Sequence, residues 1–149
     1  MTVLRWLLAF VLAVLVAAVA GSVVQTQFNL ASIAALGISI PVDVRLEVTA
    51  FDLLSFAPTY AIVAAFALLI ALLVAAWPAS AFPAVGLIWY ALAGFLAIYT
   101  ALVCMNAMLP VTVIGAARSS AGMVSLSLAG ALGGWLYGLI WVQRQKGQN

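Results

Sequence analysis

Residues 25–57 read QTQFNLASIAALGISIPVDVRLEVTAFDLLSFA, and this polar stretch interrupts an otherwise apolar chain. It contains all three acidic residues of the protein, Asp43, Glu47 and Asp52, and one of the five basic residues, Arg45. The chain is 68% hydrophobic and 5% charged, whereas a soluble domain carries about 25% charged residues. The sequence therefore predicts a polytopic membrane protein in which this stretch lies outside the lipid.

The apolar runs on either side of this stretch are long enough to cross a bilayer, which takes about 20 residues. Spans are predicted at about 5–25, 50–77, 83–109 and 119–142, with an outer loop at 26–49 and a tail at 143–149. Pro78 and Pro83 mark a tight turn between the second and third spans. The expected fold is an all-α membrane protein, a four-transmembrane-helix bundle that forms one domain over residues 1–149.

The first span has a second interpretation as a cleaved signal peptide. A basic start, an apolar run and the sequence Ala18-Val19-Ala20 match such a peptide. However, the run Trp6–Val24 is longer than the 7–15 apolar residues typical of signal peptides. We therefore favour a retained first helix, and whether residues 1–20 are kept in every context stays open.

Residues 38–48 alternate between aliphatic and polar side chains, a pattern typical of a β-strand. Asp43, Arg45 and Glu47 would share one strand face, where Arg45 would pair with the two carboxylates. A lone strand near lipid would leave backbone groups unpaired. We therefore expect a small extracytoplasmic β element at about 38–48, with 111–115 as its possible partner strand.

The ends of two helices carry capping signals. Thr49 and Asp52 fit a capping box that would start the second span near Ala50. Asn29 would cap a short helix at 30–36, and Gly37 would end it.

The distribution of basic residues predicts the orientation. Four spans place both termini on one side, with Arg5, Arg144 and Lys146, while Arg45 and Arg118 lie on the other. Basic residues accumulate in the cytoplasm, so both termini are expected there. The alanine-rich, lysine-poor composition is typical of GC-rich bacteria, so we expect the bacterial inner (plasma) membrane.

Small residues on the last span form two rows at helical spacing. Such rows allow two helices to approach closely. The pattern predicts either packing inside the bundle or an oligomer face. The rows consist of Gly130, Gly134 and Gly138, and of Ser125, Ala129 and Gly133.

The remaining candidate site is a possible partner-docking surface made of charged residues. It comprises Asp43, Arg45, Glu47, Asp52 and Arg118. The chain has no histidine and one cysteine, Cys104, which leaves no His-based metal site, no intrachain disulfide and no Ser–His or Cys–His pair. We predict no catalytic, cofactor-binding or metal residues, and the scattered basic residues offer no nucleic-acid surface.

Three functions follow as hypotheses. The favoured one is an accessory, assembly or scaffold subunit of a larger membrane complex, whose partners are lipid and other subunits or further copies of the chain. The alternative is a small transporter, channel or lipid- or quinone-binding carrier that works as a homo-oligomer. An enzyme that uses Asp43 and Glu47 is the least favoured.

Overall fold

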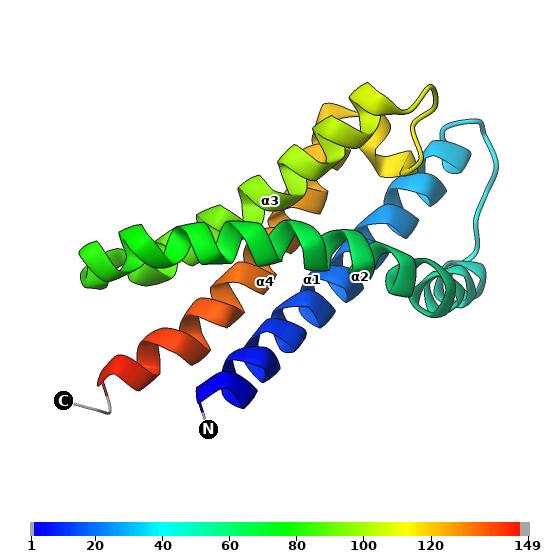
Figure 1. The fold of residues 1–149 in the computed structure, drawn as a ribbon. Helices are drawn as coiled ribbons and strands as arrows, with labels where there is room; N and C mark the ends of the chain where they lie inside the picture. Colours follow the sequence, from blue (N-terminus) through cyan, green and yellow to red (C-terminus); the bar gives the residue numbers. More distant parts are fainter. Residues whose placement is uncertain (1, 147–149) are drawn as a thin grey trace.

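The computed structural model describes residues 2–146, and the side chains of residues 3–141. Within that part of the chain the long elements are α1 (Thr2–Ala34), α2 (Val42–Ala81), α3 (Gly86–Met108) and α4 (Ser120–Lys146). Two short 3-10 helices, η1 (Pro83–Val85) and η2 (Gly115–Arg118), precede α3 and α4. Both chain ends lie at the end of the bundle opposite the α1–α2 and α3–α4 connections (Figure 1).

The four long helices pack in cyclic order. α1 contacts α2 and α4, and α3 also contacts both of these, whereas α2 and α4 hardly touch each other. Each helix is long and apolar enough to cross a membrane. Large apolar side chains are exposed around the bundle, including Leu15, Ile70 and Leu132. Lipid is the solvent that such a surface requires, so the chain is a multi-pass membrane protein and the expected four-helix bundle is confirmed.

The core between the helices is built largely from alanine. Ala9, Ala13 and Ala17 lie every fourth residue on α1 and are almost completely buried. In lipid, helices associate through close packing rather than through the hydrophobic effect, so a seam of small side chains favours assembly. Larger side chains such as Leu68 and Ile98 fill the centre.

The predicted β element is wrong. Pro41, with φ −60° and ψ 157°, directly precedes α2, and residues 42–48 are helical. Residues 110–114 form an irregular connection, so within the described residues no strand is present to pair with. The alternating pattern misleads because it also fits a helix with one half-buried face. That face contains Arg45, Val48, Thr49, Asp52, Leu53 and Phe56.

The helical geometry also separates the charges that a strand would bring together. Residues two apart on a helix lie about 200° apart around its axis. Asp43 and Glu47 accordingly point outward and are exposed, whereas Arg45 is on the half-buried side. The expected shared face of Asp43, Arg45 and Glu47 is therefore wrong.

The predicted capping signals have mixed outcomes. Thr49 lies inside α2, where its hydroxyl donates to the Arg45 carbonyl oxygen at 2.7 Å, so the capping box is wrong. Asn29 does not interrupt α1, which continues to Ala34. Gly37 does end this region as expected, because its φ of 84° is a left-handed conformation that glycine adopts without strain.

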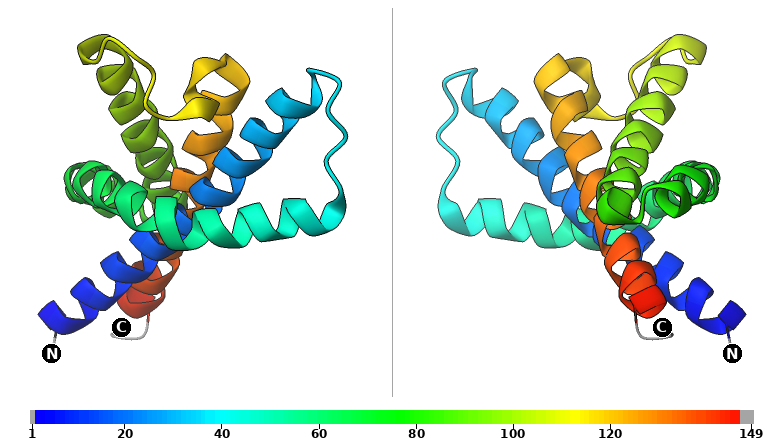
Figure 2. Two further views of the ribbon diagram at one scale, coloured as in Figure 1. Left: turned by 90° about the vertical axis from the view of Figure 1, so that its right-hand side faces the viewer. Right: turned by 90° about the vertical axis from the view of Figure 1, so that its left-hand side faces the viewer.

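α2 bends sharply near Pro58 (Figures 1 and 2). A proline inside a helix lacks an N–H and clashes with the preceding turn, which kinks the helix. The segment before the bend, residues 42–57, is called the arm. Figure 2 shows the arm extending sideways from the bundle. The following 24 residues of α2, 58–81, supply the length needed for a membrane crossing.

Candidate functional site

Polar side chains gather where the arm and the α3–α4 connection meet α1. On α1, Ser22 and Thr26 have no exposed surface and Gln25 is 6% exposed. Burying such groups away from water is costly unless they form hydrogen bonds. Their partners therefore indicate what these residues hold in place.

Two side-chain hydrogen bonds fasten the arm to α1. The Thr26 hydroxyl donates to the Asp52 carboxylate at 2.6 Å, and the Gln27 amide donates to the Thr49 hydroxyl at 3.3 Å. The Thr26 oxygen also lies 3.0 Å from the Ser22 carbonyl oxygen. Asp52, which the sequence assigns to docking, is thus half-buried against α1 and fixes the arm.

A third α1 side chain holds η2. The Gln25 side-chain oxygen accepts the Ala116 backbone N–H at 2.8 Å, and the Asn106 amide of α3 donates to the Ala117 carbonyl at 3.3 Å. Ala116 and Ala117 are buried. Buried backbone polar groups need hydrogen-bond partners, and the Gln25 and Asn106 side chains supply them for the Ala116 N–H and the Ala117 carbonyl.

The close approach of η2 to α1 requires a glycine. A Cβ on Gly115 would overlap the side-chain oxygen of Asn29 and lie 3.3 Å from the side-chain nitrogen of Gln25. Thus Gln25, Asn29 and Gly115 form one contact between distant parts of the chain.

Two buried hydroxyls in this region have no hydrogen-bond partner, those of Ser22 and Tyr60. Tyr60 packs its ring against Gly21, where a Cβ would overlap the ring, and it stacks on Phe56 at 5.5 Å. The tyrosine thus anchors α2 to α1 just beyond the bend at Pro58.

The remaining docking candidates are on the surface. Asp43 and Glu47 are exposed on the arm, one turn apart, and Arg118 is exposed at the end of η2. The structure does not bring all five charged residues together: Arg118 is the last residue of η2, which packs against α1 and α4, while the other four belong to the arm of α2. Sequence reasoning missed Gln25 and Thr26 as contact residues, although polar side chains at 22, 25, 26 and 29 have the spacing of one helix face.

The glycine row on α4 contacts α3 of the same chain. A Cβ on Gly130 would overlap the Gly94 carbonyl oxygen, and one on Gly134 would overlap that of Tyr90. A Cβ on Gly138 would lie 3.0 Å from Leu87 and Tyr90 side-chain atoms. These three glycines are buried, so an oligomer face along this row would require α3 to move away.

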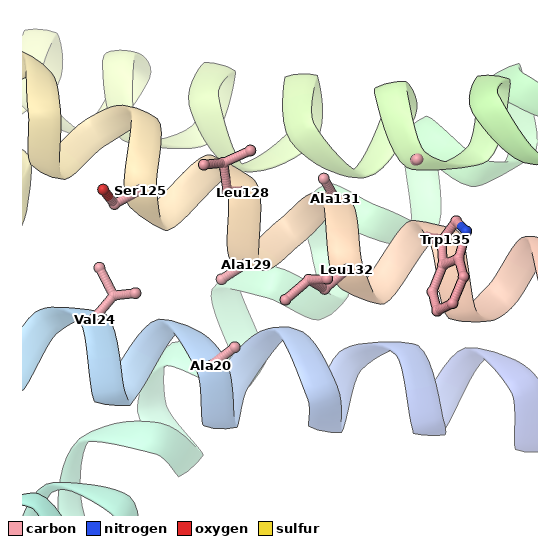
Figure 3. Close-up of a pocket in the computed structure, with 9 residues that line it drawn as sticks. Ala20, Val24, Ser125, Leu128, Ala129, Ala131, Leu132 and Trp135 are labelled. Carbon is pink, nitrogen blue, oxygen red and sulfur yellow. The ribbon is translucent and has the colours of Figure 1, made fainter.

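The second small-residue row turns toward α1. A Cβ on Gly133 would lie 2.5 Å from the Ala13 carbonyl oxygen. Ala129 is buried, while Ser125 is half-exposed. Ser125 and Ala129 also line an open apolar groove of about 610 Å³, which runs along α4 beside α1. Val24 and Ala20 of α1 form its other side (Figure 3).

Among the described residues, no group of three or more His, Cys, Asp or Glu side chains is arranged to hold a metal ion. No family model, curated protein or solved structure matches this chain. The fold defines the class: an α-helical, multi-pass membrane protein with a bent second helix.

Proposed function

We propose that this protein is an accessory or scaffold subunit of a larger membrane complex, and that the arm of α2 is its docking surface. The observation that carries the proposal is the exposed face of the arm. It combines the carboxylates of Asp43 and Glu47 with large apolar side chains such as Leu46, Phe51 and Leu54, which are 67%, 67% and 82% exposed.

Two features make the arm suited to binding protein. Its inner side is tied to α1 through Thr26 and Gln27, so little conformational freedom is lost when a partner binds. Its outer side mixes apolar and acidic groups, which favours a partner with a basic rim around an apolar centre. We propose that the membrane is the bacterial inner membrane and that the arm lies on its outer side.

The proposal is tested by photo-crosslinking in cells of the source organism. A crosslinking amino acid is placed at Glu47 or Leu54 on the arm, and at Ile70 on the exposed side of α2 as a control. The crosslinker should give the same protein adduct at both arm positions. The crosslinker at position 70 should not give this adduct. The double variant Asp43→Asn, Glu47→Gln should weaken this adduct.

Adducts to lipid alone at both arm positions would contradict the proposal. So would a monomer after purification in mild detergent together with normal growth of the deletion strain.

A further inference from the structure

The groove between α1 and α4 leads toward a basic residue at one end. η2 packs against both α1 and α4. Its last residue, Arg118, is exposed and lies two positions before the start of α4 at Ser120. The groove begins about one and a half turns further along α4, at Ser125, and ends at Trp135.

The environment of Arg118 favours an anion. All three acidic residues of the chain belong to α2, which hardly touches α4. The first N–H groups of a helix have no partner within it and carry partial positive charge. Arg118 adds a full charge beside this helix start, where Ser119 accepts the Gly122 N–H at 3.0 Å.

The lining of the groove favours a flexible chain over another helix. Leu128, Leu132 and Trp135 are 54%, 51% and 45% exposed and project along α4. Figure 3 shows the Trp135 ring extending from α4 toward α1. Small residues let two helix backbones approach closely, and these three large side chains disfavour such an approach along this side of α4. An acyl chain bends around such side chains and fills the space between them.

The dimensions fit one lipid leaflet. Trp135 lies 15 residues after Ser120 on α4, a rise of about 22 Å along the helix. Half of a bilayer with its head-group region is also about 20–22 Å thick. A phosphate beside Arg118 would therefore place an acyl chain along the groove.

We propose that the α1–α4 groove binds one acyl chain of an anionic phospholipid whose phosphate lies at Arg118 and the first turn of α4. This site is separate from the arm and does not depend on the docking function. The lipid covers Ala129 and Ala131 and bridges α1 and α4 from the membrane side.

The test is native mass spectrometry of the purified protein in micelles that contain equal amounts of dioleoyl phosphatidylglycerol and dioleoyl phosphatidylcholine. The wild type should retain one phosphatidylglycerol in preference to phosphatidylcholine. Arg118→Gln should lower that retention about fivefold, the effect of one basic residue near an anionic surface. Ala131→Leu, which fills the groove, should lower the retention of both lipids.

Matched variants separate the site from general effects. Arg5→Gln removes an equivalent charge from the other end of α1, and Ala76→Leu adds the same bulk to an exposed position outside the groove. Both should bind lipid as the wild type does. If Ala131→Leu is not recovered folded, Ala20→Leu fills the groove from α1.

Several results would overturn the proposal. One is that Arg118→Gln and Arg5→Gln retain equal amounts of phosphatidylglycerol. Another is that the groove-filling variant and Ala76→Leu retain equal amounts of both lipids. Competition by glycerol phosphate would assign the affinity to a free phosphate compound instead of a lipid.

Discussion

The Thr26 hydroxyl lies 2.6 Å from the Asp52 carboxylate, and this contact joins the buried side of α1 to the arm of α2. Thr26 has no exposed surface, and Asp52 is half-buried, unlike Asp43 and Glu47. One acidic residue thus holds the arm while the other two face outward. The proposed binding of a partner to the outer carboxylates can therefore be tested separately from the attachment of the arm.

Thr26→Val should loosen the arm. Valine keeps the shape of threonine but removes the donor to Asp52. Because Asp52 is half-exposed and regains water, the free energy of unfolding should fall by only about 1 kcal/mol. Spin labels at Ser32 and Ser55, both exposed, should report a broader distance distribution between α1 and the arm.

Thr59→Val serves as the control, because Thr59 is exposed on α2 beyond the bend. The labelled proteins carry Cys104→Ser. If Thr26→Val and Thr59→Val give the same distances and stability, the hydrogen bond does not hold the arm.

Gln25→Leu should release the α3–α4 connection. The Ala116 N–H would lose its acceptor while it stays buried, which costs about 1–3 kcal/mol. Hydrogen exchange in residues 110–119 should become faster. Gln27→Leu is the matched control, since Gln27 is exposed and its bond to Thr49 is long at 3.3 Å. Unchanged exchange in Gln25→Leu would show that other contacts hold η2.

The sequence alone predicts the number of spans, because a long apolar segment must be surrounded by lipid and not by water. Runs of apolar residues such as Thr59–Trp77 fit only lipid, whatever they pack against. The small-residue rows likewise predicted that α4 packs closely. The sequence does not show which helix each row contacts, because that depends on how the helices cross. The partner glycine on α3, Gly94, was therefore not predicted.

The arm was mispredicted because a short alternating segment is compatible with two structures. From Val42 to Val48 each polar residue lies between aliphatic ones, so period-2 reasoning favours a strand. The deciding contacts are distant: Thr26 and Gln27 fix only positions 49 and 52, which share a helix face. Pairing Gln25 with Ala116 across 91 residues was equally beyond any local pattern.

Gly94→Ala should disrupt the α3–α4 contact. The added methyl would overlap the Gly130 backbone, which cannot rotate away as a side chain does. Overpacking of this kind costs about 1–3 kcal/mol, so thermal unfolding in detergent should occur at a lower temperature. Gly138→Ala should have a smaller effect, because its nearest neighbours, at 3.0 Å, include the flexible end of Leu87. Equal effects of the two variants would show that the overlap with the Gly130 backbone adds no cost beyond that of an overlap with side chains.

The last prediction concerns the side of the membrane on which the arm lies. Ser39, in the α1–α2 connection, and Ser80, near the end of α2, are both exposed and lie at opposite ends of the bundle. In a Cys104→Ser background, Ser39→Cys should react with a membrane-impermeant maleimide in intact cells or spheroplasts. Ser80→Cys should react only after permeabilisation, because the positive-inside rule predicts that Arg5, Arg144 and Lys146 place that end in the cytoplasm. The reverse pattern would put the acidic face of the arm in the cytoplasm, and the docking partner would then have to be sought there.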